Sequence, residues 1–141
     1  MQQFIEFFGN HLALFAALGT VMLFIVANEV HGNVTGGKRL GPLEAVRIIN
    51  DREPVSVDLR PSGDFKKGHL LNAINIPLAK IEERAGELSK DKSRPVLLYC
   101  ALGGSSVEAA NKLRKLGFTE AYPIRGGING WMQSNLPVTA K

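Results

Sequence analysis

Cys100 is the only cysteine of this 141-residue chain and its first candidate for chemistry. It ends the apolar run "PVLLYC" and precedes a loop that contains Gly103 and Gly104, after which a helical pattern begins. A thiol between a strand and a helix can be surrounded by backbone N–H groups, and the helix dipole adds positive potential there. Both features favour the thiolate, the nucleophilic form of cysteine. The alternative is a buried and inert thiol, which is common among free cysteines.

A single cysteine also limits the chemistry. It excludes an internal disulfide and a metal site built from several cysteines. It excludes an internal resolving thiol as well, so any group formed on Cys100 has to pass to another molecule.

The elements that position Cys100 alternate between strands and helices. The patterns predict strands over 54–59, 73–77, 95–100 and 120–124, and helices over 41–50, 78–88, 105–117 and 127–134. Such alternation predicts a parallel sheet with helices on both faces. The residues expected to face the core from the first and third helices are Leu43, Val46, Ile49, Val107, Ala110 and Leu113.

In a parallel sheet of this kind, sites lie beyond the carboxyl ends of the strands. Three segments reach that edge with polar or reactive residues: Asp58-Leu59-Arg60, Cys100 with its loop, and Arg125-Gly126-Gly127. They are the candidate site.

The basic residues are unevenly distributed. The net charge is +4, and all 17 Lys and Arg lie after residue 37. They form no run of four or more, so the charge suits an anionic membrane surface or an anionic substrate, and nucleic-acid binding has little support.

The first forty residues predict a membrane anchor. The stretch Leu12–Ala27 is interrupted only by Gly19 and Thr20, and a helix over about 7–27 would span roughly 30 Å, one hydrocarbon core. A secretory signal peptide would need basic residues before the span, and a buried helix would show a polar face. We therefore expect an anchor over 1–30, a flexible linker over 31–37 and a globular domain over 38–141.

Residues 38–138 resemble the rhodanese family. The resemblance rests on "DLRPSGDFKKGHLLNAINIP", "LYCALGGSSVEAANKLRKLGF" and "GGINGWMQSNLPV", three ordered motifs at the spacing of that family. It implies a five-stranded parallel sheet of order 1-5-4-2-3 and sulfur transfer without a metal or organic cofactor. The cysteine takes sulfur from thiosulfate or a persulfide and passes it to a thiol acceptor.

The resemblance also assigns the residues of the site. Cys100 is the implied persulfide-forming residue, and the implied substrate-binding backbone comprises Ala101, Leu102, Gly103, Gly104 and Ser105. Asp58 matches the family aspartate and is expected to orient the neighbouring loop. His69 is expected to serve packing rather than chemistry.

The loop departs from the family pattern at one position. "CALGGS" has the six-residue frame of the sulfurtransferases, but Ser105 stands where the family has arginine. A phosphate dianion needs charge-assisted donors, so the chemistry of the related phosphatases is not expected. Thiosulfate activity should be weak. Arg60 and Arg125 are expected to compensate, with the alternatives that Arg60 pairs with Asp58 or Asp64 and that Arg125 is a solvated loop charge.

Two functions remain open from the sequence. The first is a membrane-tethered sulfurtransferase or sulfur carrier. The second is a non-catalytic adaptor whose anchor docks on a membrane protein. The anchored arrangement resembles membrane-tethered bacterial proteins of this family. The positive-inside rule then predicts the inner membrane, with the N-terminus outside and the domain in the cytoplasm.

Overall fold

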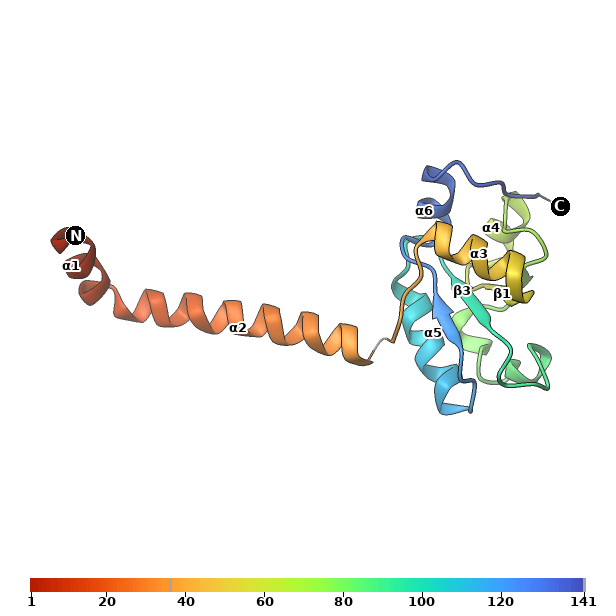
Figure 1. The fold of residues 1–141 in the computed structure, drawn as a ribbon, viewed down its shortest axis with the longest axis horizontal. Helices are drawn as coiled ribbons and strands as arrows, with labels where there is room; N and C mark the ends of the chain where they lie inside the picture. Colours follow the sequence, from red (N-terminus) through yellow and green to blue (C-terminus); the bar gives the residue numbers. More distant parts are fainter. Residues whose placement is uncertain (36, 141) are drawn as a thin grey trace. The chain divides into compact units, whose positions relative to one another are not determined.

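A parallel sheet lies at the centre of the larger of two units (Figure 1). The computed structural model describes residues 1–35 and 37–140, which separate into two compact units with the boundary after Thr35. The sheet has the order β2-β1-β3-β4, and each neighbouring pair is parallel. Its strands are β1 (Val55–Asp58), β2 (Ile74–Asn75), β3 (Val96–Tyr99) and β4 (Ala121–Pro123).

The predicted α/β class is confirmed, while the first expected strand is reduced to one residue. Leu40 forms an isolated parallel bridge with Ile124, directly after β4. With that bridge counted as strand 1, the order is the expected 1-5-4-2-3. Pairing stops there because Pro42 has no N–H to donate and begins helix α3 (Pro42–Arg52).

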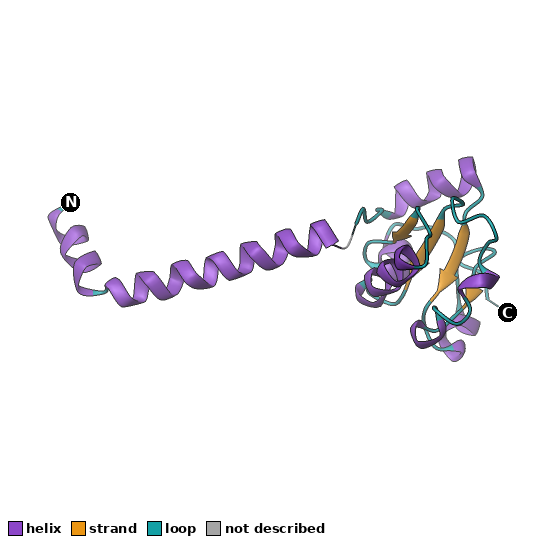
Figure 2. Ribbon diagram, turned by 90° about the horizontal axis from the view of Figure 1, so that it is seen from below, coloured by secondary structure: helices purple, strands orange, loops and turns teal. Residues whose placement is uncertain are grey.

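Helices cover both faces of the sheet (Figure 2). Helix α5 (Gly104–Lys115) packs on one face, and α3 and α6 (Gly127–Gln133) pack on the other. All four residues of β3 are buried, and they alternate between the two core clusters, with Val96 and Leu98 on the α5 side. The uninterrupted apolar run of β3 therefore fills both cores.

One predicted helix is replaced by tighter turns. Residues 78–88 form two 3₁₀ turns, η1 (Leu78–Lys80) and η2 (Ala85–Glu87), instead of an α-helix. Gly86 weakens an α-helix at this point because glycine loses more conformational freedom on ordering than other residues. Ile81 and Leu88 are nevertheless buried, as the apolar pattern requires.

Two side chains expected in the core lie elsewhere. Leu43 is 66% exposed, and Ala45 is the buried residue of α3. Val107 is only partly buried and lines a cavity described below, whereas Ser106, Ala109, Ala110 and Leu113 are the buried residues of α5. Each inward face is thus rotated slightly from the predicted one.

The first unit is helical and largely apolar. It consists of α1 (Gln2–Asn10) and α2 (Leu12–Thr35), with a turn at His11 between them. The single expected helix over 7–27 is therefore two helices, and the stretch of α2 long and apolar enough to cross a membrane is Leu12–His31. Helix α2 continues through residues 31–35, which the sequence predicted as linker, and Gly36 lies outside the described residues.

The short element α4 (Ser62–Lys67) completes the larger unit. It lies between β1 and β2 in the chain. Its C-terminal end leads into Gly68 and His69, and the latter pairs with Thr139 through two backbone hydrogen bonds of 2.8 Å. Thr139, near the C-terminal end, is thereby held beside the segment that follows α4.

Candidate functional site

Cys100 follows the last residue of β3 and lies just before α5. Its side chain is buried, with 8% of the residue exposed. The backbone N–H of Gly103 donates a hydrogen bond to Cys100 Sγ at 3.0 Å. The N–H groups of Gly104 and Ser105 open the first turn of α5, where helix geometry offers no intrahelical acceptor. The sulfur therefore accepts one backbone hydrogen bond, from the residue that caps the N-terminus of α5.

Gly103 gives the loop its shape. Its φ of 103° is left-handed, and a Cβ there would lie 3.2 Å from the backbone nitrogen of Gly126. The buried Ser106 hydroxyl donates to the Gly103 carbonyl at 2.8 Å and closes the loop from the helix side. This use of Ser106 was not predicted from the sequence.

The start of α6 holds the other side of the loop. The N–H of Ile128 donates to the Cys100 carbonyl at 2.9 Å, and the N–H of Asn129 donates to the Ala101 carbonyl at 3.2 Å. Gly127, with φ 58°, makes this approach possible, because a Cβ there would overlap the carbonyl oxygens of Cys100 and Ala101. The "RGGING" segment therefore determines the path of the cysteine loop.

A cavity of about 410 Å³ adjoins the loop. It brings together Leu102, Gly103 and Gly104, which the sequence predicted, with Arg125 after β4. Ala101 and Ser105 are exposed and are not part of its lining. The full lining is Arg39, Leu102, Gly103, Gly104, Val107, Arg125 and Gly126.

Arg39 is the cavity residue that sequence reasoning missed. It precedes Leu40, which pairs with Ile124, so it lies beside the end of β4. The expected strand order already placed the first strand next to the fifth. A cation in that first strand was the signal that could have identified it.

Arg60 forms an ion pair inside the domain. Its Nη2 lies 2.6 Å from Asp58 Oδ2 and 2.6 Å from the Gly68 carbonyl, and its Nε lies 3.0 Å from Asp58 Oδ1. Hydrogen bonds to Asp58, aided by the charge of that carboxylate, raise the pKa of Arg60. Arg60 is not in the cavity lining, so of the two sequence candidates for a compensating cation the cavity holds Arg125.

Asp58 is fully buried and serves as the centre of this pair. It also accepts the backbone N–H of Arg60 at 2.9 Å. Nearby, the Tyr99 hydroxyl accepts the Leu70 N–H at 3.1 Å, and burial, with the charge of Asp58, raises the pKa of Tyr99. These contacts tie the segment after β1 to β3.

His69 packs against Phe65 and is not among the residues that line the cavity beside the cysteine loop. Its ring stacks on Phe65 with centroids 3.8 Å apart, and its Nδ1 lies 2.8 Å from the Phe65 carbonyl. Within residues 1–35 and 37–140, no group of three His, Cys, Asp or Glu side chains is arranged to hold a metal ion.

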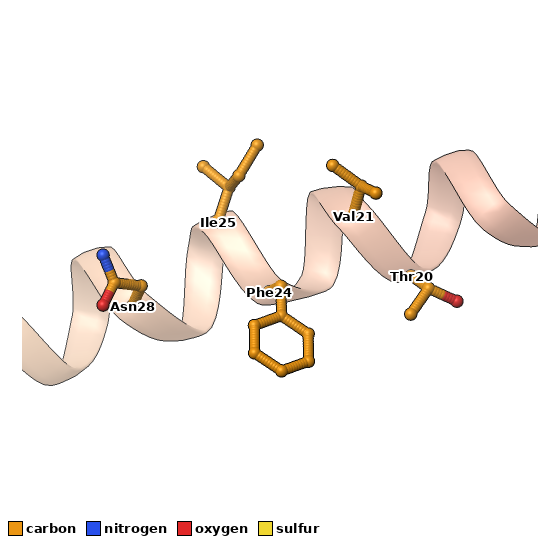
Figure 3. Close-up of a pocket in the computed structure, with 5 residues that line it drawn as sticks. All are labelled: Thr20, Val21, Phe24, Ile25 and Asn28. Atoms are coloured by element: carbon orange, nitrogen blue, oxygen red, sulfur yellow. The ribbon is translucent and has the colours of Figure 1, made fainter.

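A second hollow lies on α2 and is separate from this chemistry. It is lined by Thr20, Val21, Phe24, Ile25 and Asn28 (Figure 3). Val21 and Ile25 project from the same side of the helix one turn apart, and the Thr20 hydroxyl donates to the Ala16 carbonyl at 2.8 Å. The hollow is a shallow apolar surface of one helix without a reactive group.

Comparisons with known proteins agree with this geometry. A sequence profile of the rhodanese-like domain matches residues 42–134. The Escherichia coli K12 protein YibN is 34% identical over 139 residues, which cover 98% of this chain and 97% of that protein. Thiosulfate sulfurtransferase GlpE of Coxiella burnetii is 35% identical over 94 residues, which cover 67% of this chain and 86% of GlpE. The crystal structure of a rhodanese-related protein from Thermoplasma volcanium superposes with a TM-score of 0.66 at 25% identity, covering 74% of this chain and 100% of that one.

Replacing Gly127 tests the contact that shapes the loop. We expect Gly127→Ala to destabilise the domain by about 1–3 kcal/mol or more, because its Cβ would overlap two backbone oxygens and its φ is positive. Unfolding of the full chain in detergent, followed by the fluorescence of Trp131, measures this. Gly104→Ala is the matched control, since beyond its chain neighbours and the backbone of its own helix no atom lies within 4 Å of its Cβ position. Equal stability of the two variants would contradict the predicted clash.

Replacing Arg60 tests the buried pair. Arg60→Gln leaves the carboxylate of Asp58, which is 0% exposed, without its guanidinium, and we expect a loss of about 3–5 kcal/mol. The control is Arg52→Gln, which breaks an exposed pair with Glu120 and should cost about 1 kcal/mol or less. If both variants unfold at the same urea concentration, the Arg60–Asp58 pair does not stabilise the domain more than an exposed pair does, and the prediction is wrong.

Proposed function

Because the chain belongs to the rhodanese-like domain family, we propose that it is a sulfurtransferase or sulfur carrier that forms a persulfide on Cys100. The relative GlpE, named a thiosulfate sulfurtransferase, supports this class of activity. A sulfur donor and a thiol acceptor are the corresponding partners.

The observation that carries the proposal is the hydrogen bond from the Gly103 N–H to Cys100 Sγ at 3.0 Å. An N–H donor aimed at sulfur stabilises negative charge on it, and the N-terminus of α5 adds positive potential at the same place. The same donors can stabilise a persulfide anion after the transfer.

The proposed reaction has two displacement steps. The Cys100 thiolate attacks the outer sulfur of the donor, the S–S bond of thiosulfate breaks, and sulfite leaves with the bonding electron pair. The persulfide Cys100–S–S⁻ results. An acceptor thiolate then attacks the terminal sulfur, becomes a persulfide itself, and restores the Cys100 thiolate. No oxidant or reductant is consumed.

Ser105 makes thiosulfate a weak donor in this proposal. It is exposed and offers a neutral hydroxyl where the family loop ends in arginine. Loss of one charge-assisted contact typically removes about 1.5–3 kcal/mol, or roughly ten- to a hundredfold in affinity. Arg125 in the adjoining cavity is the available cation nearest to the loop in the sheet order.

The first unit fits the role of a membrane anchor. Leu12–His31 is 20 residues long, about 30 Å as a helix, which matches a hydrocarbon core. All Lys and Arg follow it, so the domain is proposed to lie on the cytoplasmic side of a bacterial inner membrane.

Intact-mass measurement tests the persulfide. The full chain in uncharged detergent, treated with thiosulfate or with an organic persulfide, is expected to gain the mass of one sulfur atom. Cys100→Ser should gain none, and a thiol acceptor should remove the gain. No gain with either donor would reject sulfur transfer and favour the non-catalytic adaptor.

Protease accessibility tests the anchor and its orientation. In spheroplasts of bacteria expressing the full chain, we expect the domain to resist added protease until the membrane is opened, whereas a tag before Met1 should be cleaved at once. Introducing Gln2→Lys and Gln3→Lys adds charge before the span and should reduce this orientation. Recovery of the chain in the soluble fraction, or digestion of the domain in intact spheroplasts, would contradict the proposal.

A further inference from the structure

The cavity beside the cysteine loop combines two kinds of surface. Arg39 and Arg125 contribute guanidinium groups, and Leu102 and Val107 contribute apolar side chains. Leu102 is 74% exposed although it is large and apolar. The volume of about 410 Å³ lies within the range of about 300–1,000 Å³ that is typical of pockets for small organic ligands. Thiosulfate, with five heavy atoms, would occupy a small part of it.

The backbone on both sides of Arg39 is fixed. Leu40 is 1% exposed, donates its N–H to the Pro123 carbonyl at 3.0 Å, and accepts the N–H of Arg125 at 2.8 Å. On the other side, Gly37 has φ 63° and lies so close to the Arg114 guanidinium that a Cβ would not fit. Arg39 is thus part of the folded domain. The carbonyl of the next residue, Leu40, accepts the backbone N–H of Arg125.

The two arginines are available for a ligand. Among the described residues, neither forms an ion pair with a carboxylate, whereas the adjacent Lys38 pairs with Glu44 at 3.7 Å. The Gly41 N–H, and more weakly the charges of Lys38 and Arg125, lower the pKa of Glu44. The Glu44 carboxylate is therefore anionic, and it already accepts a hydrogen bond from Gly41 and pairs with Lys38 rather than with Arg39 or Arg125.

We propose that Arg39 and Arg125 together bind the anionic group of the sulfur donor, and that this donor is an organic anion with a transferable sulfur, such as a thiosulfonate or a carboxylate-bearing persulfide, whose apolar part lies against Leu102 and Val107. The inference rests on the proposed sulfur transfer and specifies its substrate class. Guanidinium groups bind carboxylates and sulfonates through paired, charge-assisted hydrogen bonds. The charge that Ser105 does not provide is supplied from the end of β4 and from the segment that precedes α3.

Arg39 lies outside the part of the chain that the family profile matches, which begins at residue 42. The proposed site thus combines Arg39, which precedes the matched residues, with Arg125, which lies within them. The transferring step is unchanged. With an aryl thiosulfonate, Cys100 takes the terminal sulfur and the aryl sulfinate leaves with the electron pair.

Donor kinetics test this assignment in the full chain in uncharged detergent. Benzenethiosulfonate is the organic anionic donor, thiosulfate the inorganic one, and methyl methanethiosulfonate a neutral reagent that thiomethylates Cys100 and releases methanesulfinate. We expect Arg39→Gln and Arg125→Gln each to slow persulfide formation from benzenethiosulfonate about tenfold or more. Lys38→Gln removes the same charge one residue away and should change the rate less than about twofold. The neutral reagent should react equally with all four proteins.

The results that overturn the inference are specific. Equal rates for Arg39→Gln and Lys38→Gln with benzenethiosulfonate would remove Arg39 from the site. An equal slowing with the neutral reagent would mean that the substitution disturbs the loop rather than anion binding. If wild-type protein reacts no faster with benzenethiosulfonate than with thiosulfate, the organic part of the proposal is wrong.

A binding measurement separates this inference from the proposed function. The Cys100→Ser chain, titrated with the unreactive anion benzenesulfonate in a calorimeter, should bind it, and the added Arg39→Gln substitution should weaken binding about tenfold or more. Binding without any persulfide formation in the wild type would reject sulfur transfer but retain the anion site. Absence of binding, alongside normal persulfide formation, would reject the anion site alone.

Discussion

The hydrogen bonds from the Ile128 and Asn129 N–H groups to the carbonyls of Cys100 and Ala101 determine the geometry on which the site depends. They fix the chain just after β3, at the point where it has to turn toward α5. The turn allows the Gly103 N–H to reach the sulfur of Cys100. Gly127 permits this contact because any side chain there would occupy the space of the two carbonyl oxygens. A glycine 27 positions after the cysteine thus decides where the sulfur lies.

The distribution of positive charge follows from the parallel sheet. Strands β1 and β4 flank β3, so Arg60 and Arg125 both end near the cysteine loop. The two arginines differ in their surroundings. The buried Asp58 carboxylate binds Arg60, whereas Arg125 lines a cavity. A buried carboxylate is costly without a partner, and this cost keeps Arg60 in place. The arginine that lines the cavity beside the loop is therefore on the β4 side.

Most of the fold could be predicted because the apolar pattern of this chain is strong. The β-branched and apolar runs around Val57 and Leu98 indicated strands, and the helix after Cys100 followed from its periodicity. The prediction of an α-helix over 78–88 was wrong, since the apolar spacing of this segment also suits two 3₁₀ turns. Leu43 was placed inward because periodicity alone does not define the rotation of a helix, and the contact of Ala45 with the sheet does.

The sequence by itself determined the fold class, the order of the strands through family resemblance, and Cys100 as the reactive candidate. The alternation of strand and helix patterns was sufficient for the fold class, and the position of the lone cysteine between two such patterns singled out Cys100, whereas the strand order came only from the resemblance. Only the tertiary structure decided that Arg125, and not Arg60, lines the cavity beside the cysteine loop, and that Arg39 lines the same cavity. Those facts depend on pairing between residues far apart in the chain, namely Leu40 with Ile124 and Asp58 with its neighbours across the sheet. Spacing along a sequence identifies such contacts only when the order of the strands is also known.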